Sequence, residues 1–293
     1  MDYLNTVVNG IGIGAVLLLI ALGLTLTFGQ MGVINMAHGE FIMAGAYTVY
    51  LVQKIVSSTS LSLIVAVPVA FAVAGILGVV LEFLLIRHMY GRPLDTLLAT
   101  WGVSLILQQA AIDIFGSQNV TVLSPTWLDG SIDIGEIAIP KARLFILLLA
   151  LGSVVAVAGV LQLTPLGRRI RAVVQNRNLA ECSAVPTARI DRTSFLIGSG
   201  LAGVAGVAIS QIGAVGPRVG TSYIVDAFLV VVVGGIAQLK GTVIVAFALG
   251  VLQAFSEYWT TSTTAKLIVF VAIVAFLQFR PQGLFTVRTR SLA

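Results

Sequence analysis

Polar side chains recur at helical spacing inside an apolar stretch at residues 95–115. Thr100, Ser104 and Gln108 are four residues apart, so on an α-helix they form one stripe, with Trp101 beside it. The hydroxyl and amide groups of such a stripe can hydrogen-bond a neutral polar solute. They can equally hydrogen-bond a neighbouring helix, and the sequence leaves both uses open.

A second polar group interrupts the chain between two apolar stretches and contains Asn35, His38 and Glu40. Ionisable groups inside a membrane are costly, and they usually face a pathway, a partner or the bundle interior. On a regular helix His38 and Glu40 would point about 200° apart, so they line one surface only if the backbone unwinds. The residues that we expect along a substrate pathway are Asn35, His38, Glu40, Thr100, Trp101, Ser104 and Gln108.

Three further carboxylates lie in or near apolar stretches. Glu82 is placed to pair with Arg87, to support packing or to face a pathway. Asp226 and Glu257 lie near the ends of their stretches, where we expect them at the membrane interface.

No motif of the sequence indicates catalysis. It contains no HExxH, no GxSxG and no phosphate-binding G-x-x-x-x-G-K-[ST] loop. One cysteine, Cys182, and two histidines make a structural metal site improbable and exclude an intrachain disulfide. We therefore expect no enzyme and no cofactor in this chain, and an energised transporter built on it would need a separate ATPase to bind ATP and Mg.

Composition places these residues in a membrane protein. The chain is 58% hydrophobic and 10% charged, and its mean hydropathy is +1.03. Continuous apolar runs of the length that crosses a bilayer predict helices and exclude a barrel of alternating strands. We predict one all-α polytopic bundle over residues 1–293, with about 8–10 spans including short or broken helices. The expected stretches are 6–28, 40–56, 61–86, 95–115, 143–163, 194–213, 224–237, 242–258 and 265–280.

Basic residues predict the orientation of the bundle. If spans alternate, one side carries twelve Lys and Arg residues in the loops near 87–94, 164–193, 240 and 280–293, and the other side carries five. Basic loops face the cytoplasm, so we expect the N-terminus outside and the C-terminus inside. The net charge of +5 then reflects these loops and does not indicate nucleic-acid binding. No basic residue precedes Lys54, so the first stretch is expected to be a retained span and not a signal peptide.

The loop 164–193 carries six arginines and is expected to form a short helix followed by a stop at Pro186. A compact basic helix at the inner face indicates a surface where a partner docks.

Two segments share a pattern of two glycines seven residues apart, Gly32 to Gly39 and Gly234 to Gly241. Glycine-interrupted hydrophobic segments in corresponding places of two halves indicate a transporter's substrate route. Alternatively, the glycines let helices pack closely.

Four segments resemble one family: GVINMAHGEFIMAGAY (32–47), GRRIRAVVQNRNLAECSAVPTARID (167–191), AFLVVVVGGIAQLKGT (227–242) and FRPQGLF (279–285). The chain resembles, essentially from end to end, the permease subunits of ATP-binding-cassette importers of the branched-chain amino acid type. It is most similar to the urea-importer permease, because of the tracts LDTLLATWGVSLILQQA (94–110) and FGSQNVTVLSPTWLDG (115–130).

The resemblance implies a complex in the bacterial cytoplasmic (inner) membrane. Its other members would be a second homologous permease, forming a heterodimer with this chain, two cytoplasmic ATPases and an extracytoplasmic solute-binding protein. The segment 167–191 resembles a coupling helix that inserts into a groove on an ATPase. The residues assigned to coupling are Arg168, Arg171, Asn176, Glu181 and Pro186. The sequence departs from the family at Ala184, where glycine is common, and alanine favours a helix over a tight bend.

The resemblance implies urea as the substrate, and the uncharged Thr100 stripe favours it. A zwitterionic amino acid needs fixed charges or helix termini, and Arg218, Asp226 and His38 keep that alternative open. A passive channel or an ion-coupled carrier is a third alternative. A channel would have no use for a docking helix, and a proton-coupled carrier would need a carboxylate such as Glu82.

Overall fold

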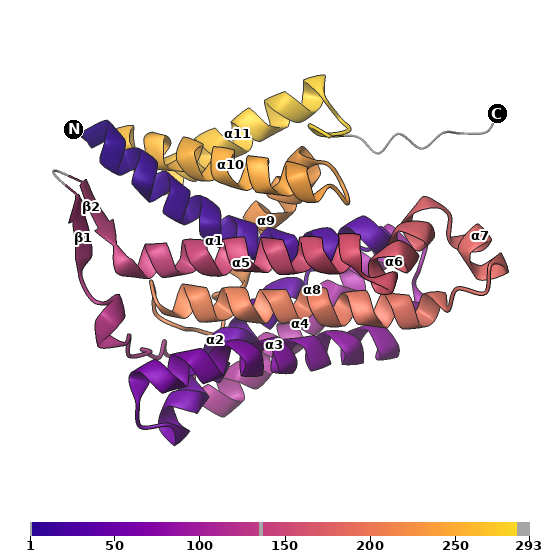
Figure 1. The fold of residues 1–293 in the computed structure, drawn as a ribbon, viewed down its shortest axis with the longest axis horizontal. Coiled ribbons are helices and arrows are strands. Elements are labelled where there is room, and N and C mark those ends of the chain that lie inside the picture. The colour runs from indigo at the N-terminus through magenta and orange to yellow at the C-terminus, as the bar shows by residue number, and fades with distance from the viewer. Residues whose placement is uncertain (1, 135–136, 286–293) are drawn as a thin grey trace.

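The computed structural model describes residues 2–134 and 137–285, which form a bundle of helices (Figure 1). Within these residues seven helices are long and apolar enough to cross a membrane. They are α1 (Asp2–Met31), α3 (Thr59–Leu84), α4 (Pro93–Phe115), α5 (Lys141–Leu163), α8 (Thr187–Ser210), α10 (Leu239–Trp259) and α11 (Ser262–Phe279). Two further helices, α2 (His38–Ile55) and α9 (Thr221–Gly234), complete the bundle. The predicted all-α polytopic fold is confirmed, and each predicted stretch corresponds to one helix.

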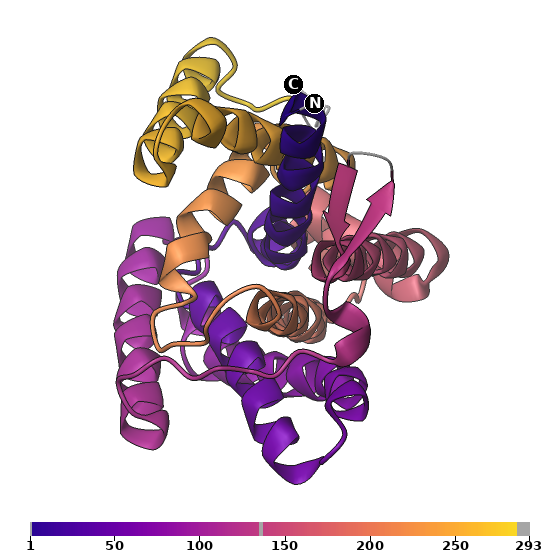
Figure 2. The ribbon, with the colours of Figure 1, turned by 90° about the vertical axis from the view of Figure 1, so that its left-hand side faces the viewer.

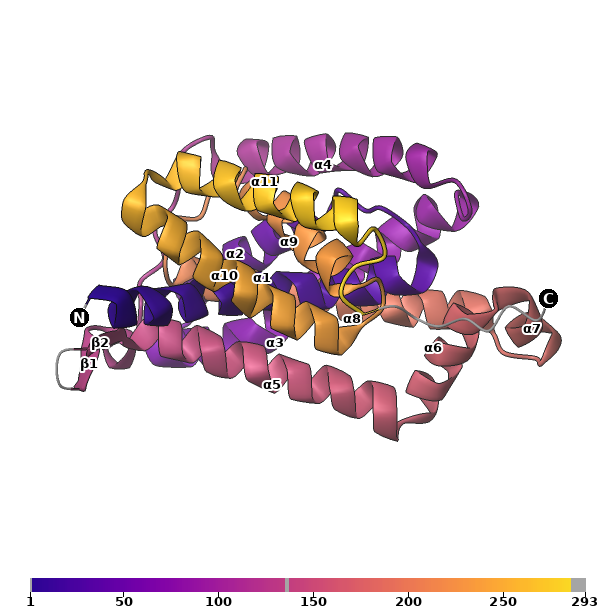
Figure 3. The same cartoon turned by 90° about the horizontal axis from the view of Figure 1, so that it is seen from above.

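The loops of the chain gather at two opposite ends of the bundle. The start of α1 and the hairpin of β1 (Ser131–Ile134) and β2 (Ile137–Pro140) lie at one end, which we call the hairpin end. Two short helices, α6 (Pro165–Gln175) and α7 (Arg177–Cys182), project at the other end (Figures 1 and 3). At this α7 end the Arg177 guanidinium lies 4.9 Å from the Tyr90 ring. The basic loops 87–94 and 164–193 therefore share an end as predicted, and Arg288 and Arg290 lie outside the described residues.

Helix α8 forms the interior of the bundle and packs through glycines. Figure 2 shows it end-on near the middle, and Figure 3 shows α4 along one edge. A Cβ added to Gly45 of α2 would overlap the carbonyl oxygen of Gly203, and one added to Gly203 would overlap that of Ala70 in α3. Small residues at helix contacts let backbones approach closely in membrane proteins.

Helix α2 begins deep inside the bundle. After α1 ends at Met31, residues 32–37 turn back, and the positive φ of Gly32 (+64°) allows this reversal. The His38 imidazole then lies 3.3 Å from the carbonyl oxygen of Ile20. Because α1 continues for eleven residues past Ile20, α2 starts about 16 Å short of the end of α1.

A second re-entrant segment, residues 211–220, leads from the end of α8 to the start of α9. A Cβ added to Gly220 would overlap the carbonyl oxygen of Gly39, so α2 and α9 begin side by side. Helix α9 has 14 residues and is about 21 Å long, too short to cross a hydrocarbon core of about 30 Å. Two partial helices thus enter the interior from opposite ends and meet there.

The two glycine motifs predicted from the sequence do not form this pair. Residues 32–39 form the first break, but its spatial counterpart is the segment 211–220. Gly234 and Gly241 instead flank the turn between α9 and α10, where a Cβ on Gly241 would overlap the carbonyl oxygen of Gly234. For this second motif, the alternative of close helix packing is correct.

Candidate functional site

Glu40 is the centre of a buried polar cluster where the two partial helices meet. The Ser104 hydroxyl and the Gln108 amide of α4 each donate a hydrogen bond of 2.8 Å to Glu40 Oε1. Gln108 also lies 3.3 Å from the Thr221 hydroxyl at the start of α9. The predicted stripe on α4 therefore forms, and it contacts a neighbouring helix.

Thr100 and Asn35 stabilise the break before α2. The Thr100 hydroxyl accepts a hydrogen bond of 3.1 Å from the Met36 backbone N–H and lies 2.7 Å from the Thr96 carbonyl oxygen. Asn35 Oδ1 accepts a hydrogen bond of 3.0 Å from the Ala37 N–H. These bonds supply partners for backbone groups that the interrupted helix leaves free.

His38 and Glu40 contact different helices, as their spacing predicts. His38 faces α1 and Glu40 faces α4. Trp101 does not join the cluster, because it lies on the outer side of α4 with 54% of its surface exposed. The structure thus brings together Glu40, Ser104 and Gln108, with Thr100 and Asn35 at the adjoining break.

Several buried polar atoms at this meeting point have no hydrogen-bond partner among the described residues. They are Asn35 Nδ2, His38 Nδ1 and Glu40 Oε2. Buried polar groups are nearly always bonded, so a concentration of unbonded ones indicates a functional region or a second conformation.

The basic loop forms two short helices where one was predicted. The Thr164 hydroxyl caps α6 by accepting from the Gly167 N–H at 3.2 Å, and Asn176 Oδ1 caps α7 by accepting from the Leu179 N–H at 3.0 Å. Pro186 does not end a helix but immediately precedes α8, which starts at Thr187. The loop therefore ends seven residues earlier than the predicted boundary at 193.

Ala184 corrects a second prediction about this loop. We expected alanine to extend the helix, but Ala184 has a φ of +57° and forms a tight bend after α7. The bend follows from its neighbours, since the Val185 N–H closes it by donating to the Ala180 carbonyl at 3.0 Å. Ala184, where the resemblance led us to expect glycine, therefore adopts the left-handed conformation that glycine favours, despite its Cβ.

One ion pair and one hydrogen bond attach α7 to α8. Arg177 Nη2 lies 2.7 Å from Oδ2 of Asp191, which is fully buried in α8, and its Nε lies 3.4 Å from Glu181. The Thr187 hydroxyl donates a bond of 2.8 Å to the same Glu181 carboxylate. Glu181 thus holds α7 against the first turn of α8, and Arg177 joins both to Tyr90.

Glu82 belongs to this network and does not pair with Arg87. Its carboxylate accepts a bond of 3.0 Å from the Tyr90 hydroxyl and lies 3.4 Å from Arg192 Nε, while Arg87 stacks on Phe83. Burial, followed by the negative charges of Asp191 and Glu82, raises the pKa of the Tyr90 phenol, so it remains a neutral donor. The network therefore anchors α7 to three parts of the bundle.

The remaining coupling residues lie on the surface of the projecting segment. Arg168 is exposed, and Arg171 donates to the Leu161 carbonyl at the end of α5. Leu179 is 64% exposed on α7. This arrangement leaves an apolar side chain on a rigidly held projection, which suits contact with a partner.

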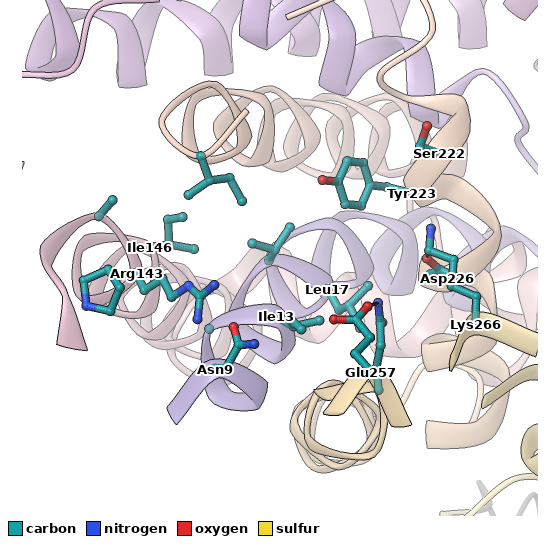
Figure 4. Close-up of a pocket in the computed structure, with 16 residues that line it drawn as sticks. Asn9, Ile13, Leu17, Arg143, Ile146, Ser222, Tyr223, Asp226, Glu257 and Lys266 are labelled. Carbon is teal, nitrogen blue, oxygen red and sulfur yellow. Dashed lines mark hydrogen bonds and ion pairs between the residues drawn. The ribbon is translucent and has the colours of Figure 1, made fainter. Parts of the chain in front are cut away.

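The sequence predictions missed a cavity of about 550 Å³ at the hairpin end, here called the outer cavity (Figure 4). Four charged side chains of both signs line it: Arg143, Asp226, Glu257 and Lys266. They come from α5, α9, α10 and α11, and α1 adds Asn9, Ile13 and Leu17. Spacing along one helix cannot reveal a site whose charges come one from each of four helices.

A second cavity of about 290 Å³, here called the inner cavity, lies toward the α7 end. It is lined by α1 from Leu22 to Gly29, by the turn before α10, and by Ile170, Arg171 and Val174 of α6. The part of α1 between the two cavities is closely packed, because residues 18–21 have no exposed surface. The two cavities are therefore separated, and a movement of α6 would change the inner one.

Comparison with known proteins shows which family the chain matches. A family described as "Branched-chain amino acid transport system / permease component" matches residues 6–277. The chain is 28% identical over 294 residues to the high-affinity branched-chain amino acid transport system permease protein BraD of Pseudomonas aeruginosa, covering 96% of this chain and 95% of that protein. It is 26% identical over 292 residues to the corresponding LivH of Escherichia coli K12, with coverage of 96% and 95%. A probable branched-chain amino acid transport permease protein LivH of Methanocaldococcus jannaschii is 26% identical over 293 residues, with coverage of 94% and 90%. No solved structure matches the chain.

Proposed function

The chain belongs to the family of branched-chain amino acid transport system permease components, and from this we propose that it is the permease subunit of an ATP-driven importer of branched-chain amino acids. It is a transport subunit and not an enzyme. In this proposal it lies in the cytoplasmic membrane with its N-terminus outside. It would pair with a second permease, two ATPases and a solute-binding protein.

The observation that carries the proposal is the α6–α7 projection. The ion pair from Arg177 to Asp191 and the hydrogen bond from Thr187 to Glu181 hold it against α8, while Leu179 remains exposed at its surface. A rigid, exposed projection can transmit the movement of a docked ATPase, and α6 also lines the inner cavity. We assign Arg168, Arg171, Asn176, Glu181 and Pro186 to the surface or the shape of this projection.

The meeting point of α2 and α9 is the proposed gate. Discontinuous helices that meet inside the membrane are typical of transporter substrate sites. Glu40, Ser104 and Gln108 join α2 to α4, and the unbonded Glu40 Oε2 leaves an acceptor for a different arrangement of these helices. Asn35, His38 and Thr100 hold the break in the closed arrangement, in which α1 separates the two cavities.

Urea remains the second candidate substrate. The uncharged side chains of Thr100, Ser104 and Gln108 favour it, but here they bond to Glu40 and to the backbone of the break. The named relatives transport branched-chain amino acids, so we place those substrates first. The two candidates differ in one respect that can be measured, because urea carries neither of the charges of an amino acid.

Uptake of radiolabelled leucine and urea, with this chain present or deleted, tests the substrate. We expect ATP-dependent leucine uptake to be lost on deletion, and urea uptake to be unchanged. Loss of urea uptake alone would overturn the amino acid proposal and leave the importer architecture intact.

Co-purification tests the coupling role. Leu179→Glu places a charge on the exposed projection and should reduce the co-purified ATPase at least tenfold. Leu123→Glu is the matched control, since Leu123 is 67% exposed and Leu179 is 64% exposed, and Leu123 lies in the loop toward the hairpin end. A normal yield of ATPase with Leu179→Glu would contradict docking at α7.

A further inference from the structure

We infer that the outer cavity binds a free amino acid with an apolar side chain, held by its charged head group between Arg143 and Glu257. This inference rests on the proposed function and adds the place where the substrate contacts this chain. It concerns residues that lie apart from the Glu40 cluster and from the α6–α7 projection.

The cavity is lined by two positive and two negative side chains, and one positive and one negative side chain form an ion pair with each other. Lys266 Nζ and Asp226 Oδ2 are 3.6 Å apart and form an ion pair. Arg143 and Glu257 attract each other electrostatically, but no ion pair joins them among the described residues. A bound group that carries one charge of each sign can fill the space between these two side chains.

Among the described residues, Arg143 is held in place without a hydrogen-bond or ion-pair partner. Its side chain lies across Gly12 of α1, where an added Cβ would be 2.8 Å from Arg143 Cδ. No hydrogen bond joins its guanidinium to another side chain in the part of the chain that the structure describes. A half-buried guanidinium is a strong bidentate donor to carboxylates, so a substrate carboxylate is the fitting partner.

The opposite charge of the head group has acceptors in the same cavity. Glu257 accepts one hydrogen bond, of 3.0 Å, from Gln253, and this leaves its carboxylate with further capacity. The buried Asn9 Oδ1 has no partner among the described residues. An α-ammonium group has three donors, which these oxygens can accept.

The rest of the lining is apolar and suits an aliphatic side chain. Ile13, Val16 and Leu17 of α1 line the cavity together with Ile146 and Ile212. Figure 4 shows Ile13 and Leu17 between Arg143 on one side and Asp226 with Lys266 on the other. The volume of about 550 Å³ falls within the range of small-molecule pockets, about 300–1,000 Å³.

Binding to the purified permease–ATPase complex, without the solute-binding protein, tests the inference directly. The probes are L-leucine, L-leucinamide, which lacks the carboxylate, and 4-methylpentanoate, which lacks the ammonium. For Arg143→Gln we expect at least tenfold weaker leucine binding and unchanged leucinamide binding. For Glu257→Gln the selectivity for leucine over 4-methylpentanoate should fall at least tenfold.

Two further variants separate binding from folding. Lys141→Gln removes the same charge from the same turn of α5 at a residue that does not line the cavity, and it should bind leucine normally. Arg143→Lys should recover part of the leucine affinity. Arg143→Gln that keeps wild-type leucine affinity, or that loses leucine and leucinamide equally, would overturn the inference.

The uptake measurement distinguishes this inference from the proposed function. If the wild-type complex imports leucine while Arg143→Gln and Glu257→Gln keep their selectivity, the cavity assignment fails and the function stands. If the wild-type complex imports and binds urea but not leucine, both fail.

Discussion

The Glu40 cluster and the outer cavity are both polar regions inside an apolar bundle, but they use their polar groups differently. In the cluster, Ser104 and Gln108 donate to a carboxylate that is 1% exposed, and the helices close around it. In the outer cavity, Arg143 and Glu257 face open space of about 550 Å³. Polar groups bonded to one another fix a conformation, whereas polar groups facing a cavity are available to a ligand.

This difference bears on how the transporter would work. We assign the closed cluster to gating and the open cavity to binding, so substitutions in the two regions should change different quantities. Cluster variants should change stability and transport rate. Cavity variants should change leucine affinity and leave stability nearly unchanged.

The largest effect is expected where the two partial helices meet. Gly220→Val places a side chain on the Gly39 carbonyl oxygen, where even a Cβ overlaps backbone. Overpacking a well-packed site costs about 1–3 kcal/mol or more, and backbone here cannot yield as a flexible side chain would. We expect little folded protein in the membrane, measured by the yield of monodisperse permease.

Gly213→Val is the matched control on the same re-entrant segment, because nothing lies within 4 Å of a Cβ added there. It should be produced at a normal yield. Equal yields of the two variants would show that α2 and α9 do not meet closely.

The next effect separates the cluster from the cavity. Glu40→Leu removes the acceptor of the buried Ser104 hydroxyl, which costs about 1–3 kcal/mol, while the half-buried Gln108 amide still has the Ser104 and Thr221 hydroxyls as acceptors. Thermal unfolding of the purified complex should therefore shift downward, and leucine uptake should fall. The Kd of leucine for the remaining folded complex should stay within about twofold, because Glu40 does not line the outer cavity.

Glu40→Gln is the conservative control, because an amide oxygen can still accept from Ser104 and Gln108. It should unfold close to the wild-type temperature. If Glu40→Leu weakens leucine binding tenfold while Glu40→Gln does not, the cluster belongs to the binding site and the comparison fails.

A smaller effect is expected from the packing of Arg143. Gly12→Ala would place a Cβ 2.8 Å from the flexible Cδ of Arg143, so the guanidinium shifts and the helices stay in place. Leucine affinity should fall about threefold to tenfold, which is about 0.7–1.4 kcal/mol, without a change in yield. Gly159→Ala in α5, which has open space around its Cβ, should change neither quantity.

The sequence predicted the helices and the shared end of the basic loops 87–94 and 164–193, because apolar length and charge are properties of the chain itself. It also predicted the stripe of Thr100, Ser104 and Gln108, since periodicity places these residues on one face. It could not predict that Ser104 and Gln108 of this stripe would donate hydrogen bonds to Glu40. This contact joins residues 64 and 68 positions apart.

Other features depended on contacts that no local pattern contains. The counterpart of the first break, residues 211–220, lacks the glycine spacing that we had used to find it. The pairing of Glu82 with Arg192 in place of Arg87 depends on how α3 meets α8. The outer cavity forms because Arg143, Asp226, Glu257 and Lys266 come together from four separate helices. In the sequence, Asp226 and Glu257 lie near the ends of their apolar stretches, so we expected them at the membrane interface.

The smallest effect on leucine affinity is expected at the ion pair within the outer cavity. It tests whether paired charges contribute less to leucine binding than unpaired charges do. Asp226 and Lys266 are 29% and 51% exposed and 3.6 Å apart, and exposed pairs of this kind contribute about 0–1 kcal/mol. Asp226→Asn and Lys266→Gln should each weaken leucine binding by no more than about fivefold, since 1 kcal/mol corresponds to that factor. Both variants break the same pair, so the double variant should bind no more weakly than the weaker single variant. An effect of Asp226→Asn larger than that of Glu257→Gln would instead make Asp226 the partner of the substrate ammonium and move the head group toward α9.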